Sequence, residues 1–72
     1  MTYRELKINI ARAGLTIKEF AELIGMHPTS ITNLKKRETI PNKIIIIVLL
    51  LVMLIESGVK IDEVKKKIER IR

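Results

Sequence analysis

The segment from Gly14 to Arg37 constrains the fold of this chain more than any other feature. Its sequence is GLTIKEFAELIGMHPTSITNLKKR, in which Gly25 separates two short helical patterns. Glycine adopts a positive φ at little cost and therefore permits a tight turn between two helices. The second pattern has a small polar side and continues into a Lys-Lys-Arg cluster. The segment thus predicts two short helices, of which the second has a polar surface that continues into a basic cluster.

Helical patterns fill the rest of the chain as well. Glycine and proline separate these patterns, and no segment alternates apolar and polar residues over the length of a strand. Two patterns open with a threonine and a glutamate three residues later, the spacing of a capping box: Thr2 with Glu5, and Thr16 with Glu19. We therefore predict an all-α fold with helices over residues 3–13, 17–24, 28–36, 42–57 and 61–71.

Length and charge narrow the possible functions. A chain of 72 residues is the size of one domain. Its net charge of +6 suits a polyanionic partner such as nucleic acid or an anionic membrane surface, although charge can also serve solubility alone. With no cysteine and one histidine, the chain lacks disulfides and any ordinary metal site. It has no nucleophile–base pair and no glycine-rich phosphate loop, so we expect neither an enzyme nor a cofactor.

An apolar run from Ile44 to Ile55 is the one segment that resembles a membrane span. As a helix it would be roughly 18 Å long, whereas the hydrocarbon core of a bilayer is about 30 Å thick. The stretch from Thr2 to Glu5 is polar and lacks the apolar region of a signal peptide. We therefore predict no transmembrane segment and a cytoplasmic location.

Residues 16–37 contain what a helix-turn-helix requires. Ala21 is small enough for two helices to approach closely, and Gly25 can make the turn between them. Ile31 and Leu34 form an apolar pair that can hold the second helix on the first. The other positions of the second helix would then face outward: Thr29, Ser30, Thr32, Asn33, Lys36 and Arg37. Such a motif places the start of its second helix against base edges in the DNA major groove.

At these positions the chain resembles the phage-repressor-like (Cro-type, lambda-repressor-like) helix-turn-helix family, over residues 3–64. The resemblance rests on an ordered set of residues: Leu15-Thr16, Glu19-Phe20-Ala21, Ile24-Gly25-Met26, Ile31, Leu34, Pro41 and the tail from Gly58-Val59 to Val64. It implies one five-helix domain over residues 1–72 that binds double-stranded DNA as a sequence-specific transcriptional regulator. A repressor acting as a homodimer is the form that the resemblance favours.

The resemblance also assigns contacts to individual residues of the second helix. It implies that four residues face the groove: Pro28, Thr29, Thr32 and Asn33. It implies that four others contact the DNA backbone: Ser30, Lys35, Lys36 and Arg37. Asn33 is the leading candidate for a base reader because its amide can pair with adenine through two hydrogen bonds. Its alternative role is that of a solvated polar residue near a helix end.

The chain departs from the family pattern at three positions. Ile17 stands where a glutamine that contacts phosphate is frequent, and Pro28 replaces a long polar side chain that often reads a base. Both changes weaken direct readout of the sequence. Arg37 stands where glycine is usual and adds positive charge, which favours phosphate contact.

The apolar run predicts a contact beyond the domain, because a helix that is apolar on every side must be buried on every side. The family resemblance places one face of this helix in the core: Ile46, Ile47, Leu50 and Leu54. At 100° per residue the opposite face becomes the predicted dimer interface: Ile45, Val48, Leu49, Val52 and Ile55. The alternatives are an antitoxin-like or adaptor module that binds a protein partner through this helix, or contact with a membrane surface.

The last predicted helix is amphipathic. Its apolar stripe is expected to be buried: Ile61, Val64, Ile68 and Ile71. Its bases alternate with acids at helical spacing, which is typical of a solvated, salt-bridged face: Lys65, Lys66, Lys67, Arg70 and Arg72 with Asp62, Glu63 and Glu69.

Overall fold

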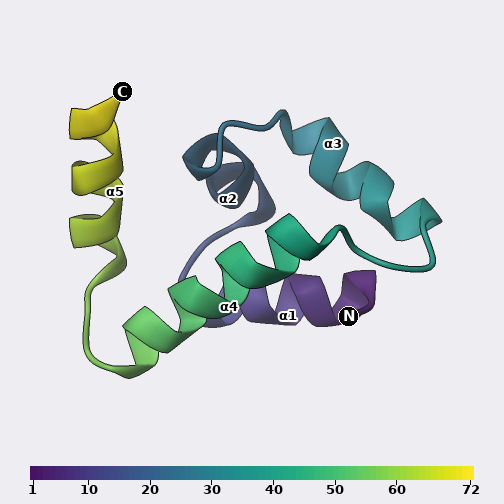
Figure 1. Ribbon diagram of the computed structural model, residues 1–72, viewed down its shortest axis with the longest axis horizontal. Helices are drawn as coiled ribbons and strands as arrows, with labels where there is room; N and C mark the ends of the chain where they lie inside the picture. Colours follow the sequence, from purple (N-terminus) through teal and green to yellow (C-terminus); the bar gives the residue numbers. More distant parts are fainter.

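The chain forms five α-helices and one 3-10 turn, with no strand, in a computed structural model that describes residues 1–72 (Figure 1). The elements are α1 (Tyr3–Arg12), α2 (Ile17–Leu23), α3 (Pro28–Thr32), the 3-10 turn η1 (Asn33–Lys36), α4 (Asn42–Glu56) and α5 (Ile61–Ile71). The predicted all-α, five-helix fold is confirmed. The third helix is shorter than expected, because its last turn tightens into the 3-10 form at Asn33.

Capping side chains define where α1 and α2 begin. At α2 the backbone N–H of Glu19 donates to Thr16 Oγ1 at 3.1 Å, and the N–H of Thr16 donates to Glu19 Oε1 at 3.0 Å. The same reciprocal pair joins Thr2 and Glu5 at α1. Each box satisfies backbone donors that have no partner inside the helix, so both predicted capping boxes are confirmed.

Gly25 makes the turn between α2 and α3, with a φ of 76°. The N–H of Met26 donates to the Ala21 carbonyl at 2.8 Å, and that of Gly25 donates to the Glu22 carbonyl at 3.2 Å. These two bonds form a Schellman motif, which requires a left-handed residue after the helix end. A side chain at this φ would be strained, which is why glycine ends the helix here.

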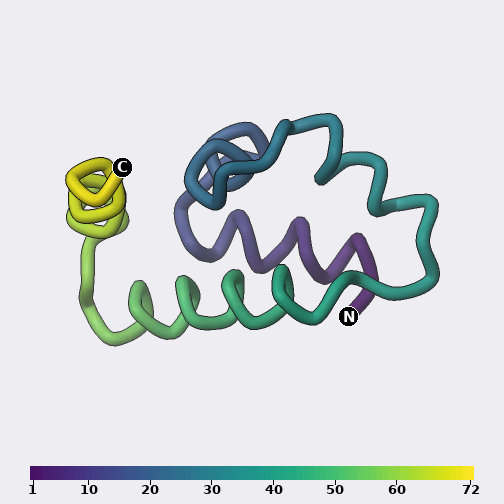
Figure 2. The backbone as a smooth tube through the Cα atoms, turned by 45° about the horizontal axis from the view of Figure 1, so that its top comes forward, coloured from purple at the N-terminus to yellow at the C-terminus, as the bar shows by residue number.

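The core is entirely apolar and contains residues from every helix except α5. Thirteen residues are buried: Leu6, Ile10, Ala13, Leu15, Phe20, Ala21, Ile31, Leu34, Ile40, Ile44, Val48, Leu51 and Val52. Helices α1 and α4 lie side by side and run in the same direction, and α2 and α3 pack over one side of this pair (Figure 2). The core therefore lies between α1, α4 and the helix-turn-helix.

The predicted orientation of α4 is wrong. Val48 is 0% exposed and Val52 is 5% exposed, so neither can belong to the predicted dimer interface. Ile45 and Ile55 are half-buried against the core, which leaves Leu49, at 41% exposed, as the one exposed residue of that prediction. The residues expected inside are exposed or half-buried instead: Ile46, Ile47, Leu50 and Leu54.

The orientation of α4 follows from how the chain enters it. Ile40, just before the helix, is buried and Ile44 in its first turn is buried with it. At 100° per residue, a helix that buries Ile44 also buries Val48, Leu51 and Val52. An apolar sequence carries no polar residues to mark its outer side, so the pattern alone could not distinguish this orientation from others.

The predicted burial of the α5 stripe is also wrong. No residue of α5 is fully buried; Ile61, Val64 and Ile68 are half-buried, and Ile71 is 86% exposed. Ile71 lies about 100° around α5 from Arg72, whose guanidinium contacts the end of α2, so the apolar stripe turns away from α2 at this end of the helix.

No helix combines the length and the hydropathy that crossing a bilayer requires.

The two faces of α4 predict opposite results for the same substitution at adjacent positions. Val52→Glu should unfold the domain, because a buried unpaired charge costs several kcal/mol and a domain of this size is stable by about 5–10 kcal/mol. Met53→Glu should keep the helical content, because Met53 is 64% exposed. Circular dichroism and urea unfolding of both variants would measure this. A folded Val52→Glu variant would contradict the orientation described above.

Candidate nucleic-acid interface

The second helix of the helix-turn-helix buries one side and exposes the other. Ile31 and Leu34 are buried against α2 and the core. Opposite them, residues four apart in α3 and three apart in η1 lie nearly in line along the helix. Thr29, Asn33 and Lys36 therefore form an exposed row, which we call the polar row.

Asn33 contributes both a hydrogen-bond donor and an acceptor to the polar row. Its side chain is exposed and bonds to no other group of the chain, so both its amide donor and its carbonyl acceptor are available. Thr32 differs, because it is half-buried and its hydroxyl donates to the Thr29 carbonyl at 3.1 Å. Pro28 is half-buried at the first position of the helix. Of the four residues predicted to face a groove, Thr29 and Asn33 are thus the fully exposed pair.

Three consecutive cations lie at the end of the polar row, and Lys36 belongs to both sets. Lys35, Lys36 and Arg37 are all exposed, and none pairs with an acidic side chain. Ser30 is exposed on the same helix, as predicted for a residue that contacts the DNA backbone. Unpaired cations on a helix end can neutralise phosphates and release their counterions.

The start of α3 is capped by His27, the one histidine of the chain. The N–H of Thr29 donates to His27 Nδ1 at 3.2 Å, so His27 is the N-cap of this helix. A side-chain acceptor at this position satisfies one backbone donor of the first turn. Pro28 follows at the first helical position, where its missing N–H costs nothing.

Packing against α2 determines where the polar row lies. Helices α2 and α3 contact each other, and Ala21 of α2 is fully buried with a side chain small enough to permit a close approach. Ile17 is half-buried against the core, and its side chain offers no hydrogen-bond donor at the start of α2. The chain therefore lacks, at this position, the phosphate contact that a glutamine could make.

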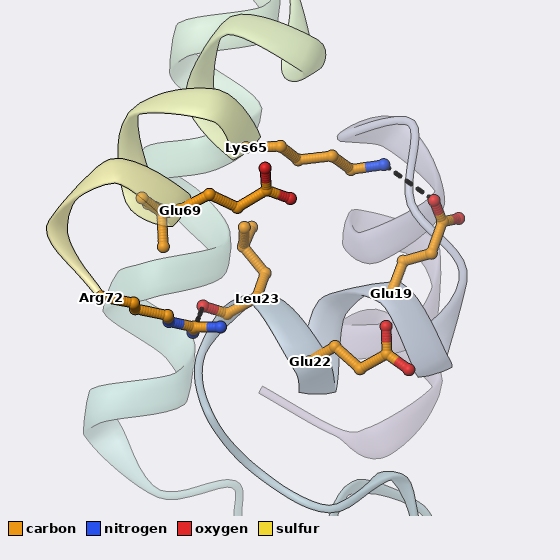
Figure 3. Close-up of a pocket in the computed structure, with 7 residues that line it drawn as sticks. Glu19, Glu22, Leu23, Lys65, Glu69 and Arg72 are labelled. Atoms are coloured by element: carbon orange, nitrogen blue, oxygen red, sulfur yellow. Dashed lines mark hydrogen bonds and ion pairs between the residues drawn. The ribbon is translucent and has the colours of Figure 1, made fainter.

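A groove between α2 and α5 contains the charged contacts that the sequence did not predict (Figure 3). Its volume is about 280 Å³, and its lining consists of Glu19, Glu22, Leu23, Lys65, Ile68, Glu69 and Arg72. Lys65 Nζ lies 2.8 Å from Glu19 Oε2. The Arg72 guanidinium donates to the Leu23 carbonyl.

Lys65 and Arg72 bind α2, whereas the charge pattern predicted that they lie on a solvated, salt-bridged face of α5. The available signal was their spacing: counted from Ile61 at 100° per residue, both fall on the apolar side of α5. Lys66, Lys67 and Arg70 are exposed, in agreement with the prediction for them.

The contact with Lys65 changes the ionisation of both partners. Its hydrogen bond is the largest of the effects that lower the pKa of Glu19 from 4.5 to about 2, and the N–H and hydroxyl of Thr16 act in the same direction. The same hydrogen bond raises the pKa of Lys65 above its usual value. Glu19 thus serves two structures at once, the cap of α2 and the attachment of α5.

A family profile described as helix-turn-helix matches residues 6–64. The chain belongs to the Cro/C1-type helix-turn-helix family. The match contains the whole polar row, the three cations and α4, and it ends at Val64, inside α5. No curated protein and no solved structure matched the chain.

Membership of the Cro/C1-type family makes this chain a DNA-binding helix-turn-helix regulator. The lambda-repressor-like resemblance seen in the sequence is thereby confirmed. The chain contains no group of three side chains that could hold a metal ion.

Acid should weaken the attachment of α5 through Glu19. Because the pKa of Glu19 is about 2 in the folded chain and near 4.5 when unpaired, its ionised form stabilises the fold above about pH 4.5. This contribution is lost as the pH falls through about 2. The difference in Tm between the parent chain and Glu19→Gln should therefore be full at pH 7 and small near pH 2.

Thermal unfolding followed by circular dichroism between pH 2 and 7 would measure this difference. Glu22→Gln is a matched control, since Glu22 lines the same groove but forms no ion pair. A Glu19→Gln difference that stays constant over this pH range would contradict the role of the carboxylate.

Proposed function

We propose that this chain is a sequence-specific DNA-binding repressor that acts as a homodimer. The observation that carries the proposal is the polar row, in which the free amide of Asn33 lies between Thr29 and Lys36. In this arrangement Asn33 pairs with an adenine edge in the major groove, and Lys35, Lys36 and Arg37 contact phosphates on its flank. Thr29 lies next to Asn33 and meets the neighbouring base.

Dimerisation is supported by the exposed side of α4. Five large apolar residues lie there, and we call them the α4 stripe: Ile46, Leu49, Leu50, Met53 and Leu54. A contiguous exposed apolar stripe of this kind is typical of a surface that another molecule covers. In a two-fold dimer the same stripe of each copy would meet its counterpart.

The size of the domain is compatible with a dimer on DNA. The longest dimension of the chain is 32 Å. Half-sites that are read from one side of the duplex lie about 34 Å apart, one turn of DNA. Two copies joined through the α4 stripe could therefore present their polar rows to successive turns of the major groove.

A second candidate function rests on the same stripe. An antitoxin-like or adaptor module would use the α4 stripe to bind a different protein. Solution mass distinguishes the two functions, because a stable dimer of the chain alone favours the repressor. A chain that stays soluble only with a co-expressed partner favours the adaptor.

Asn33 and Lys36 should affect DNA binding in different ways. Asn33→Ala should weaken binding to the preferred site by about 1–3 kcal/mol and leave binding to random duplex DNA nearly unchanged, because it removes a base contact. Lys36→Ala should weaken binding to all sequences alike and lower the slope of log affinity against log salt by about 1. The preferred site is first selected from random duplexes, and both variants are then titrated by fluorescence anisotropy at several salt concentrations.

Each variant serves as the control for the other, since both residues lie in the same exposed row. Equal losses on both DNAs for Asn33→Ala would remove it as a base reader. An unchanged salt slope for Lys36→Ala would remove it from the phosphate contacts.

Leu50→Glu should convert the dimer into folded monomers. It introduces like charges where two stripes meet, and Leu50 is exposed in the single chain, so the fold itself should persist. Affinity for a two-half-site duplex should fall steeply, because each monomer contributes one recognition helix. Analytical ultracentrifugation measures the mass, and Ile8→Glu, at an exposed apolar position on α1, is the control. A Leu50→Glu chain that remains dimeric would place the interface elsewhere.

A further inference from the structure

Helix α2 lies between α3 on one side and α5 on the other (Figures 1 and 2). Its contact with α3 is the apolar one that forms the helix-turn-helix. Its contact with α5 is different in kind, because no residue of α5 is fully buried. Two charged side chains of α5 instead bind the two ends of α2.

Lys65 binds the beginning of α2. Its ammonium contacts Glu19, whose carboxylate also accepts the N–H of Thr16 in the capping box. The side chains of Lys65 and Glu19 are 30% and 40% exposed, so the pair is partly shielded from solvent. Partial shielding reduces the screening that makes most surface ion pairs weak.

Arg72 binds the end of α2. The Schellman motif uses the carbonyls of Ala21 and Glu22, and it leaves the Leu23 carbonyl without a backbone partner. The Arg72 guanidinium donates to this carbonyl (Figure 3). A Cβ built on Gly25 would lie 3.9 Å from Arg72 Nη2, so the guanidinium also packs against the turn that leads into α3.

The spacing of these two cations matches the helix that they hold. Lys65 in α5 and Arg72, the C-cap residue of this helix, are seven residues apart, which is roughly two helical turns or 10 Å. Helix α2 has seven residues and therefore nearly the same length. One face of α5 thus reaches both the capping box of α2 and its C-terminal carbonyl.

We propose that α5 clamps α2, and that Lys65 and Arg72 are positioning residues for DNA recognition. The clamp holds the turn at Gly25, and this turn sets the direction in which α3 presents the polar row. Neither cation lies within the segment that the family profile matches, which ends at Val64. The part of the proposal that concerns DNA rests on the proposed function.

The clamp acts on specific binding more than on general attraction to DNA. Reading a base edge requires Asn33 to be held in one orientation, whereas phosphate contact by Lys35 to Arg37 tolerates movement of the helix. Loosening the turn should therefore reduce affinity for the preferred site while affinity for random duplex changes little.

Hydrogen exchange tests the clamp without DNA. In Arg72→Gln the amide protons of Gly25 and Met26 should exchange faster by about tenfold, the factor expected when a hydrogen bond from a charged donor is lost. Lys65→Gln should accelerate exchange at the start of α2. Lys66→Gln removes the same charge from an exposed position of α5 and should change neither. Unchanged protection at Gly25 and Met26 in Arg72→Gln would overturn the clamp.

DNA binding then tests the positioning role. Arg72→Gln should lower affinity for the preferred site by about tenfold and for random duplex by less than about twofold, with an unchanged salt slope. Arg72→Lys keeps a charged donor and should recover part of the lost specificity. Equal losses on both DNAs, with a salt slope lower by about 1, would show that Arg72 contacts phosphate and would overturn the positioning role. If the parent chain binds no duplex, the proposed function is wrong, and the exchange experiment still decides the clamp.

Discussion

The close contact between α2 and α3 is the interaction on which the rest of the structure depends. Ala21 allows the two helices to approach, and Ile31 and Leu34 fill the space between α3 and the core. This contact forms only because Gly25 adopts a positive φ, which ends α2 in a tight turn that leads into α3. Once Ile31 and Leu34 are buried, the exposed position of Asn33 follows from helix geometry. The candidate interface is therefore a consequence of how the apolar side of α3 packs.

Local signals made most of this predictable from the sequence. The two Thr–Glu capping boxes, the glycine at the turn and Pro28 at a helix start each act over four residues or fewer. Such signals do not depend on the rest of the fold, and the helix starts predicted from them were confirmed. The exposed residues of the recognition helix were likewise predictable, because Ile31 and Leu34 mark its inner side clearly.

The remaining features depend on contacts between distant segments. The burial of Ile40 and Ile44 determines which side of α4 faces the core. Within an all-apolar run, no difference in polarity marks Val48 as buried and Leu50 as exposed. The attachment of α5 depends on Glu19, which lies 46 residues before Lys65. The register that the family resemblance implied for α4 was wrong, because the burial of Ile40 and Ile44 places Val48 and Val52 inside.

The apolar composition of α4 has a consequence for how the chain folds. Burial of either side of this helix lowers the free energy of the chain. A collapsed chain can therefore dock the wrong side against α1. No buried polar group opposes that arrangement, since every core residue is apolar. Correct docking then requires the helix to roll about its own axis in a compact state, which is a form of kinetic frustration. We expect the rate of refolding to fall as the protein concentration rises, because the misdocked state exposes apolar surface to other chains.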